Sequence, residues 1–233
     1  MVAFRFRKIN LKKYNWGKLG LELLVVFLGV SSGFLLNNWR ERQQEQKLEQ
    51  KYIKGFLKDV GANEEQLKKM IAADSLWLDQ STQNVLAMRG DSLLLDSAEA
   101  VTKKIIGINR VQFYEGTYRD ITNSGNLNII RDFELRSGIV DYQIALNDVR
   151  FVDDYFYQFF NDFVMPFVLA NFDVLTASFK DESSYRTLEF SNVFVGYYAM
   201  VQQRRKAYSD LLDKSRSFKE LLLSMQKEEV VKP

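Results

Sequence analysis

The chain has 233 residues and a net charge of +2, and it contains neither Cys nor His and only two Pro. Without Cys it has no disulfide framework or thiolate chemistry, and without His it lacks the commonest general base and transition-metal ligand. The basic excess lies in the N-terminal tail, so the slightly acidic remainder argues against a nucleic-acid partner. Scarce Pro and abundant Phe and Tyr favour an all-α fold of long helices around an aromatic core.

An apolar run at residues 19–36, LGLELLVVFLGVSSGFLL, predicts a single transmembrane helix. Crossing the hydrocarbon takes about 20 mostly apolar residues, and Trp16 and Trp39 bracket the run like the two interfacial aromatic belts. Asn37 and Asn38 begin a polar exit. A secretory signal peptide also has a basic start and an apolar centre, but a cleavage site would follow it, whereas NNWRERQQEQ follows here. We therefore predict an uncleaved anchor, with the lipid bilayer as one partner.

Lys and Arg residues around the run bear on its orientation. The N-terminal tail carries basic side chains and no acid, which favours a cytoplasmic N-terminus, although basic residues also follow the run closely. We therefore predict that most of the chain lies outside the cytoplasm. The predicted divisions are a basic cytoplasmic tail at 1–17, a transmembrane helix at 18–39, a helical domain at 40–228 and a tail at 229–233.

Two features within the predicted span concern helix association. Gly29 and Gly33, with Ser32 beside them, form a small-residue pattern that lets two helices approach closely, although Gly is also simply common in membrane helices. Glu22 lies about one turn inside the span, where a carboxylate is costly. It either contacts a partner helix or an ion pathway, or it reaches the head-groups and pairs with Lys18.

Residues 40–72 continue in helical period, so we predict that the membrane helix extends without a linker and reaches as far as Met88. The alternative is a break near Gly61, or a new helix capped at Asp74 or Ser75. Gly90-Asp91-Ser92 predicts a turn, and a short helix follows over residues 96–106.

The next helices are predicted from caps and periodicity. Residues 123–126 are expected to close a helix in a turn, and Asp132 is expected to cap a helix that runs to Phe163. That helix carries Phe at several positions, and we predict that its aromatic rows form core, with Asp153 and neighbouring polar residues on the opposite side. The aromatic rows are Phe151, Tyr155, Phe159 and Phe163, and Phe156 and Phe160.

The last part of the chain is predicted to hold a shorter helix and a loop over residues 164–183, broken by Pro166. Ser183 or Ser184 is then expected to cap a long final helix that ends near Gln226. Its apolar stripe is interrupted over residues 202–206, which are all polar.

The order of these motifs resembles a domain-of-unknown-function family of single-anchor membrane proteins common in Bacteroidota. The resemblance covers the chain to about residue 145, and it implies an envelope location in a Gram-negative cell, here the inner membrane with a periplasmic domain, but no activity. The matching positions are Glu22, Asn37, Asn38, Trp39, Ser124, Gly125, Leu127, Asp132, Leu135 and Arg136.

We therefore predict a non-enzymatic, membrane-anchored interaction or scaffold protein that self-associates or joins a larger envelope complex, with no cofactor, metal or small-molecule substrate. The alternative is an energy-coupling subunit, similar in layout to stator partners of proton-driven motors, or a sensory subunit, using Glu22 in the membrane. A hydrolase would need an all-carboxylate or Ser–Lys site, and no spacing in this sequence nominates one.

Overall fold

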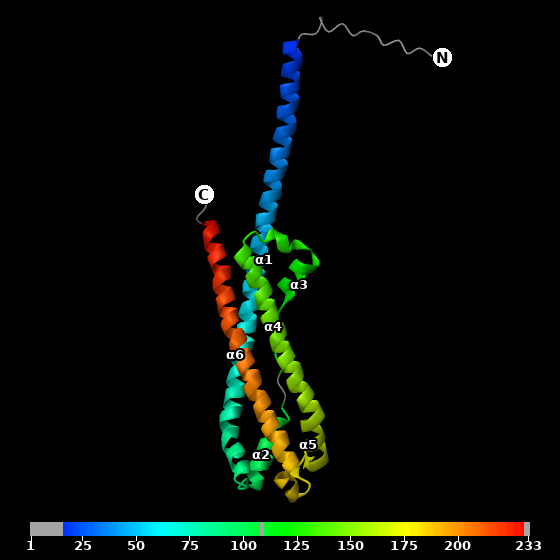
Figure 1. Ribbon diagram of the computed structural model, residues 1–233, viewed down its shortest axis with the longest axis vertical. Helices are drawn as coiled ribbons and strands as arrows, with labels where there is room; N and C mark the ends of the chain where they lie inside the picture. Colours follow the sequence, from blue (N-terminus) through cyan, green and yellow to red (C-terminus); the bar gives the residue numbers. More distant parts are fainter. Residues whose placement is uncertain (1–15, 108–109, 231–233) are drawn as a thin grey trace, which may run out of the picture. The chain divides into compact units, whose positions relative to one another are not determined.

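The computed structural model describes residues 16–107 and 110–230, so most of the predicted tails at 1–17 and 229–233 lies outside it. The predicted all-α class is confirmed, since helices make up nearly all of the described chain (Figure 1). The chain divides into two compact units, one ending at Glu49 and one beginning at Gln50. The elements are α1 (Trp16–Arg89), α2 (Leu95–Ile105), α3 (Gly116–Asn123), the 3₁₀ turn η2 (Asn126–Ile129), α4 (Phe133–Phe159), the π-helix η3 (Phe160–Val164), α5 (Met165–Asn171), β1 (Phe172–Asp173), β2 (Ser178–Phe179), the 3₁₀ turn η4 (Glu182–Arg186) and α6 (Leu188–Val230).

In the first unit, α1 contains a stretch long and apolar enough to cross a membrane, and none of that stretch is buried within the chain. In the second unit α1 stays helical through Gly61 and Asp74, so neither of the predicted breaks occurs. The helix ends at the predicted turn, where Asp91 has a left-handed φ of 48° and the Ser92 amide donates to the Ala87 carbonyl at 2.9 Å.

Local capping explains most of the remaining boundaries. Asp132 caps α4 as predicted, because its carboxylate accepts the Leu135 amide at 2.7 Å. The predicted cap of the last helix is wrong: Thr187 caps α6, with its hydroxyl accepting the Phe190 amide at 3.2 Å. Neither serine is available as that cap, since Ser183 and its neighbour lie inside η4, where Asp181 accepts the Ser183 amide.

Three long helices of the second unit share one spacing of buried residues. The part of α1 after Gln50, α4 and α6 lie side by side (Figure 1), and their buried positions recur every three or four residues, apart from one step of seven between Leu67 and Asp74 on α1, as in coiled-coil packing. We call these positions the inner seams. They are Ile53, Phe56, Val60, Asn63, Leu67, Asp74, Leu78 and Ser81 on α1; Leu135, Ile139, Tyr142, Leu146, Val149, Asp153, Phe156 and Phe160 on α4; and Phe190, Phe194, Tyr197, Val201, Arg204, Tyr208, Leu211, Ser215, Phe218 and Leu222 on α6.

At the end of this unit away from the α3–α4 corner, α2, α5 and the short β1–β2 ribbon cover the helices. Phe172 pairs with Phe179 across the antiparallel ribbon, and both rings are buried. Trp77 of α1 lies against Phe194 and Tyr197 of α6, with the Tyr197 ring centroid 5.0 Å away. The predicted aromatic core is therefore present, and it gathers at this end.

Candidate functional site

The aromatic residues of α4 divide between two faces, which corrects part of the predicted core. Phe156 and Phe160 are buried as expected. The other row is not core: Phe151 is 74% exposed, Tyr155 50% and Phe163 57%, and Phe159 is half-buried. An exposed row of large apolar side chains is unusual on a helix that already buries a complete seam, so this face is the first candidate for a binding surface.

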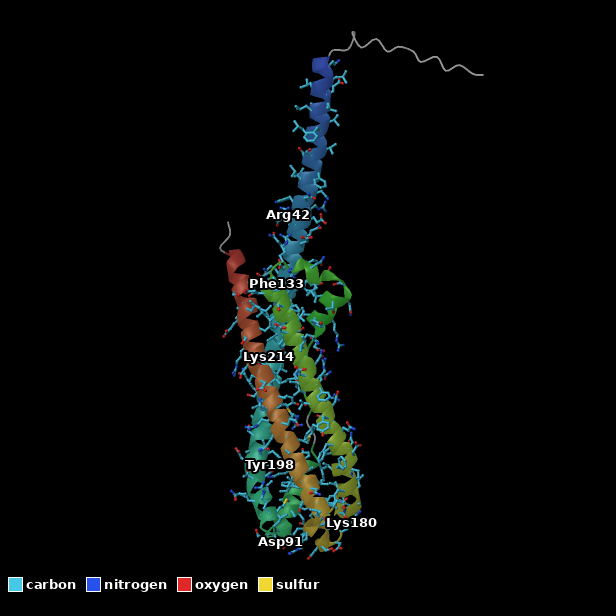
Figure 2. The ribbon with its side chains drawn as sticks, viewed as in Figure 1. Arg42, Asp91, Phe133, Lys180, Tyr198 and Lys214 are labelled. Carbon is cyan, nitrogen blue, oxygen red and sulfur yellow. The ribbon has the colours of Figure 1, made fainter. Side chains whose placement is uncertain are left out.

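The exposed residues of α4 form a second seam with its own regular spacing. Six of them recur at steps of four and three residues on the side of α4 opposite the inner seam, and Tyr155 extends the apolar surface by one further turn. Figure 2 labels Phe133, which begins this row at the start of α4 and is 73% exposed. We call it the outer seam: Phe133, Ser137, Val140, Ile144, Asn147 and Phe151.

One flank of the outer seam borders a groove between α4 and α6. Two hollows of about 540 and 350 Å³ share Lys214 in their lining, and both have α4 on one side and α6 on the other. Asp141 and Asp148 line them from α4, and Asp210 and Asp213 line them from α6. Carboxylates therefore predominate along this flank.

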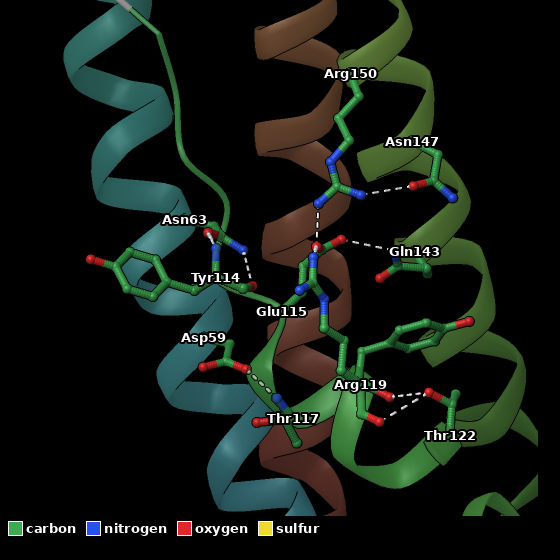
Figure 3. A network of polar contacts seen from close by, with 11 residues as sticks. Asp59, Asn63, Tyr114, Glu115, Thr117, Arg119, Thr122, Gln143, Asn147 and Arg150 are labelled. Atoms are coloured by element: carbon green, nitrogen blue, oxygen red, sulfur yellow. Dashed lines mark hydrogen bonds and ion pairs between the residues drawn. The ribbon is translucent and has the colours of Figure 1, made fainter.

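The other flank of the outer seam carries Arg150 and Gln143, which hold the segment before α3. Figure 3 shows the Glu115 carboxylate between the guanidinium groups of Arg119 and Arg150. Gln143 also donates to Glu115 at 2.8 Å. Burial opposes ionisation of Glu115, but the hydrogen bonds and charge of Arg150, with Gln143, outweigh it and hold the pKa of this carboxyl below its ordinary value.

Polar side chains of α1 complete the attachment of this segment. Asn63 is fully buried and bonds both backbone groups of Tyr114, accepting its amide at 2.7 Å and donating to its carbonyl at 3.0 Å. Asp59 accepts the Thr117 amide at 2.9 Å in the first turn of α3 (Figure 3). The network satisfies the backbone of an irregular segment, and its role is structural.

A buried polar layer crosses the three inner seams, and sequence reasoning missed it. Asp74 of α1 accepts from Arg204 of α6 through both carboxylate oxygens, with Nε to Oδ2 at 3.0 Å, and both side chains are 6% exposed. The guanidinium also stacks on Phe156 at 4.1 Å. Asp153, predicted on the polar side of α4, is instead buried and accepts the Tyr208 hydroxyl at 2.6 Å.

Burial dominates the titration of this layer. It raises the pKa of Asp74 and of Asp153 above their ordinary value of 3.8, although Arg204 opposes the shift at Asp74 and Tyr208 opposes it at Asp153. Burial likewise raises the pKa of Tyr197 to about 12. Burial and the Asp153 carboxylate raise the pKa of Tyr208 further. These groups stabilise one another inside the protein, and Asp74, Tyr197 and Arg204 also line a hollow of about 280 Å³ between α1 and α6.

The spacing of α6 contained the signal for this layer. Residues 202–206 look like an interruption of the apolar stripe, yet Arg204 falls three residues after Val201 and four before Tyr208, in register with the inner seam. A charged residue in register with core positions predicts a buried partner on another helix.

The candidate residues of the predicted span lie on α1 of the first unit. Glu22, Gly29 and Gly33 are seven and four residues apart, so they share one helix face, with Ser32 at its edge. A Cβ built at either glycine meets nothing within 4 Å, so this face is open. Glu22 is exposed, and within the described chain it forms no ion pair with Lys18, so both alternatives given for this carboxylate stay predictions.

The residues predicted to mark the membrane interfaces are part of the same helix. α1 begins at Trp16, whose side chain lies outside the described ones, and it continues through Asn37 and Asn38. Trp39 is 62% exposed, as an interfacial anchor requires. The helix therefore does not end at the polar exit.

Six of the ten positions that match the family lie in the second unit and build the corner between α3 and α4. We call them the family-like motif: Ser124, Gly125, Leu127, Asp132, Leu135 and Arg136. Ser124 is the C-cap of α3 and its hydroxyl donates to the Asp120 carbonyl at 2.7 Å, while Gly125 takes a left-handed φ of 71°. Leu127 is half-buried and Leu135 fully buried beside the capping Asp132. Arg136 donates to the carbonyls of residues 130 and 131.

Tyr52 of α1 holds this corner. Its hydroxyl accepts from the Asn126 amide group at 2.9 Å and lies 3.3 Å from the Ser124 hydroxyl oxygen. All six motif residues therefore have structural roles in one chain reversal.

Within the described ranges, no group of three or more carboxylates is arranged to hold a metal ion. Comparison of the chain with protein families, curated proteins and solved structures finds no match. The resemblance noted from the motifs stays a prediction.

Proposed function

We propose that this chain is a non-enzymatic, membrane-anchored interaction protein that binds a protein partner through the outer seam of α4. The observation that carries the proposal is the exposure of that seam, in which Phe133 and Phe151 are each about three-quarters exposed on a regular helix. A helix whose inner seam is already packed gains nothing for its own fold from a second apolar seam. Binding of another helix is the use that matches its spacing.

The anchor part of the proposal is supported by the apolar stretch of α1, which no side chain within the described ranges buries. Hydrocarbon is the environment that suits such a surface. The basic tail and the family resemblance support an inner-membrane location, with the N-terminus in the cytoplasm and the second unit in the periplasm.

A second candidate function is an energy-coupling or sensory subunit. It is favoured by the position of Glu22 on the same open helix face as Gly29 and Gly33, where a partner helix would meet the carboxylate. Under this candidate, Glu22→Gln abolishes the coupled process while membrane insertion persists. Under the interaction-protein proposal, Glu22→Gln leaves partner binding through α4 intact.

Photo-crosslinking in native membranes tests the proposal. A photoreactive amino acid at Ser137, an exposed polar position of the outer seam, is expected to give a light-dependent protein adduct. The same group at Gln83, exposed on α1, is the control and is expected to give none. Equal yields at both positions would contradict the proposed surface, and release of the protein from vesicles by carbonate would contradict the anchor.

A further inference from the structure

The size of the exposed surface on α4 matches one side of a stable protein interface. Aromatic side chains present about 150–250 Å² each, so Phe133, Phe151 and Tyr155, with Ile144 and Val140, leave on the order of 500 Å² of apolar surface exposed. An interface is about 60% apolar, so this patch corresponds to roughly 800 Å² per partner, the usual size for a specific complex.

The two flanks of the outer seam differ in charge. Taking Ser137, Ile144 and Phe151 as the first core position of a heptad, the second core positions are Phe133, Val140 and Asn147. The residues directly after the second positions are all acidic, and those directly before the first positions are basic or neutral. The acidic flank is Glu134, Asp141 and Asp148, and the opposite flank is Arg136, Gln143 and Arg150.

This arrangement is complementary to itself in one orientation. When two identical helices pair in parallel about a two-fold axis, the acidic flank of each lies along the basic flank of the other. Arg136 of one copy then faces Asp141 of the other, five residues further along. In an antiparallel pair the acidic flank of one copy lies along the acidic flank of the other. Asp141 and Asp148 would then lie against carboxylates.

We infer that the partner of the outer seam is a second copy of this chain, bound in parallel through α4 about a two-fold axis. The inference rests on the proposed function, in which this seam is a binding surface. Parallel pairing about a two-fold axis sets identical core residues opposite each other. Ser137 therefore lies beside Ser137 of the second copy, and Asn147 beside Asn147. An Asn at a core position specifies register, as expected for a seam that must pair in one alignment.

Single engineered thiols test the pairing in the full-length chain, because the native sequence has no Cys. Ser137→Cys and Asn147→Cys are made separately, the proteins are reconstituted in phosphatidylcholine vesicles, and disulfide formation is followed after mild oxidation. Parallel pairing brings each thiol to its own counterpart within disulfide reach, so each variant is expected to form a dimer by itself. Gln83→Cys on α1 is the control, and it is expected to form no disulfide-linked dimer.

Two further variants test whether the seam and its charges cause the pairing. Phe151→Glu is expected to weaken association roughly a hundredfold, because it removes one of the two most exposed aromatic side chains of the seam from both copies. Leu175→Glu, at a side chain 94% exposed outside α4, is the matched control and is expected to leave dimer yield unchanged. Asp141→Arg sets like charges together in a parallel pair, so it is expected to reduce dimer yield.

The outcomes separate this inference from the proposed function. Self-linking at both seam positions that is lost with Phe151→Glu supports the second copy. Cross-linking only when Ser137→Cys and Asn147→Cys are mixed overturns the parallel arrangement. No self-linking in vesicles, together with a light-dependent adduct to a different protein in native membranes, overturns the second copy but keeps the proposed function. No adduct and no self-linking overturns both.

Discussion

Replacing Arg204 with Met removes the charge partner of Asp74 inside the second unit. The carboxylate of Asp74 is 6% exposed, and both of its oxygens accept from this guanidinium. In the variant the carboxylate must either stay charged without a partner or take up a proton, and both states destabilise the folded protein.

Protonation of the Asp74 carboxylate sets the upper limit of the electrostatic cost of removing Arg204. Keeping Asp74 protonated at pH 7 costs about 1.36 kcal/mol for each pH unit above its ordinary pKa of 3.8, or roughly 4.4 kcal/mol. Breaking a buried ion pair typically costs about 3–5 kcal/mol, which agrees with this limit. The lost stacking of Arg204 on Phe156 adds on the order of 1 kcal/mol that does not depend on pH.

The pH dependence gives the sharper test. Burial without a partner raises the folded-state pKa of Asp74 above its unfolded value, so the folded state holds the proton more tightly and stability falls as pH rises through that window. The proton term should therefore shrink from about 4.4 kcal/mol at pH 7 to about 1.6 kcal/mol at pH 5.

Urea unfolding of the full-length chain in detergent micelles, followed by far-UV circular dichroism, measures this dependence. The double variant Asp74→Leu with Arg204→Met removes both charges and should recover most of the loss, since apolar replacements of buried pairs are close to neutral. A loss of stability that is the same at pH 5 and pH 7, or a double variant less stable than Arg204→Met alone, would refute the reasoning.

Three further predictions concern the same unit. Glu115 has its pKa held below its ordinary value of 4.5, so its contribution to stability is present above that pH and is lost on acidification; Glu115→Gln should flatten the acid side of a plot of Tm against pH, and an unchanged acid side would contradict this. Burial raises the pKa of Tyr197 from 10.0 to about 12, so stability should fall as pH rises above 10, and Tyr197→Phe should delay alkaline unfolding seen by circular dichroism while Tyr114→Phe, at an exposed ring, should not. Gly125→Ala should cost about 1 kcal/mol because Gly125 has a φ of 71°, whereas Gly61→Ala, in open space on α1, should stabilise by up to about 1 kcal/mol; equal effects on urea unfolding would show that backbone conformation does not decide the difference.

Local signals in the sequence predicted the helices well. The turn after Arg89, the Asp132 cap and the all-α class all follow from short-range chemistry, namely turn residues, a capping carboxylate and scarce Pro. The cap of α6 was missed because Asp181, Ser183, Ser184 and Thr187 are all competent caps within a few residues. Only the fold of the intervening 3₁₀ turn decides which of them faces the first turn of α6.

The assignment of faces on α4 could not be made from the sequence. Both seams of this helix follow the same 4-3 spacing, and both carry aromatic residues, so periodicity alone does not say which one faces α1 and α6. Asp153 was placed outside for the same reason, since its partner Tyr208 lies on a helix 55 residues further along the chain. Burial of a charged residue depends on tertiary pairing, which short-range patterns do not contain.

The family-like motif is visible in the sequence as a pattern, and the structure supplies its physical cause. Ser124, Gly125 and Asp132 are the residue types that end one helix, reverse the chain and begin the next. Their contact with Tyr52 ties the reversal to α1 and explains why the pattern includes residues that expose no reactive group.

The inner seams also limit how this protein can change length during evolution. An insertion of seven residues turns the rest of a helix by only about 20°, whereas an insertion of one to six residues turns every following side chain by about 40° or more. Residues paired across helices, such as Asp74 and Arg204, must stay opposite each other along the bundle. An added heptad therefore has to be inserted at the same level in α1, α4 and α6. Homologues of different span should therefore differ by matched multiples of seven in all three helices.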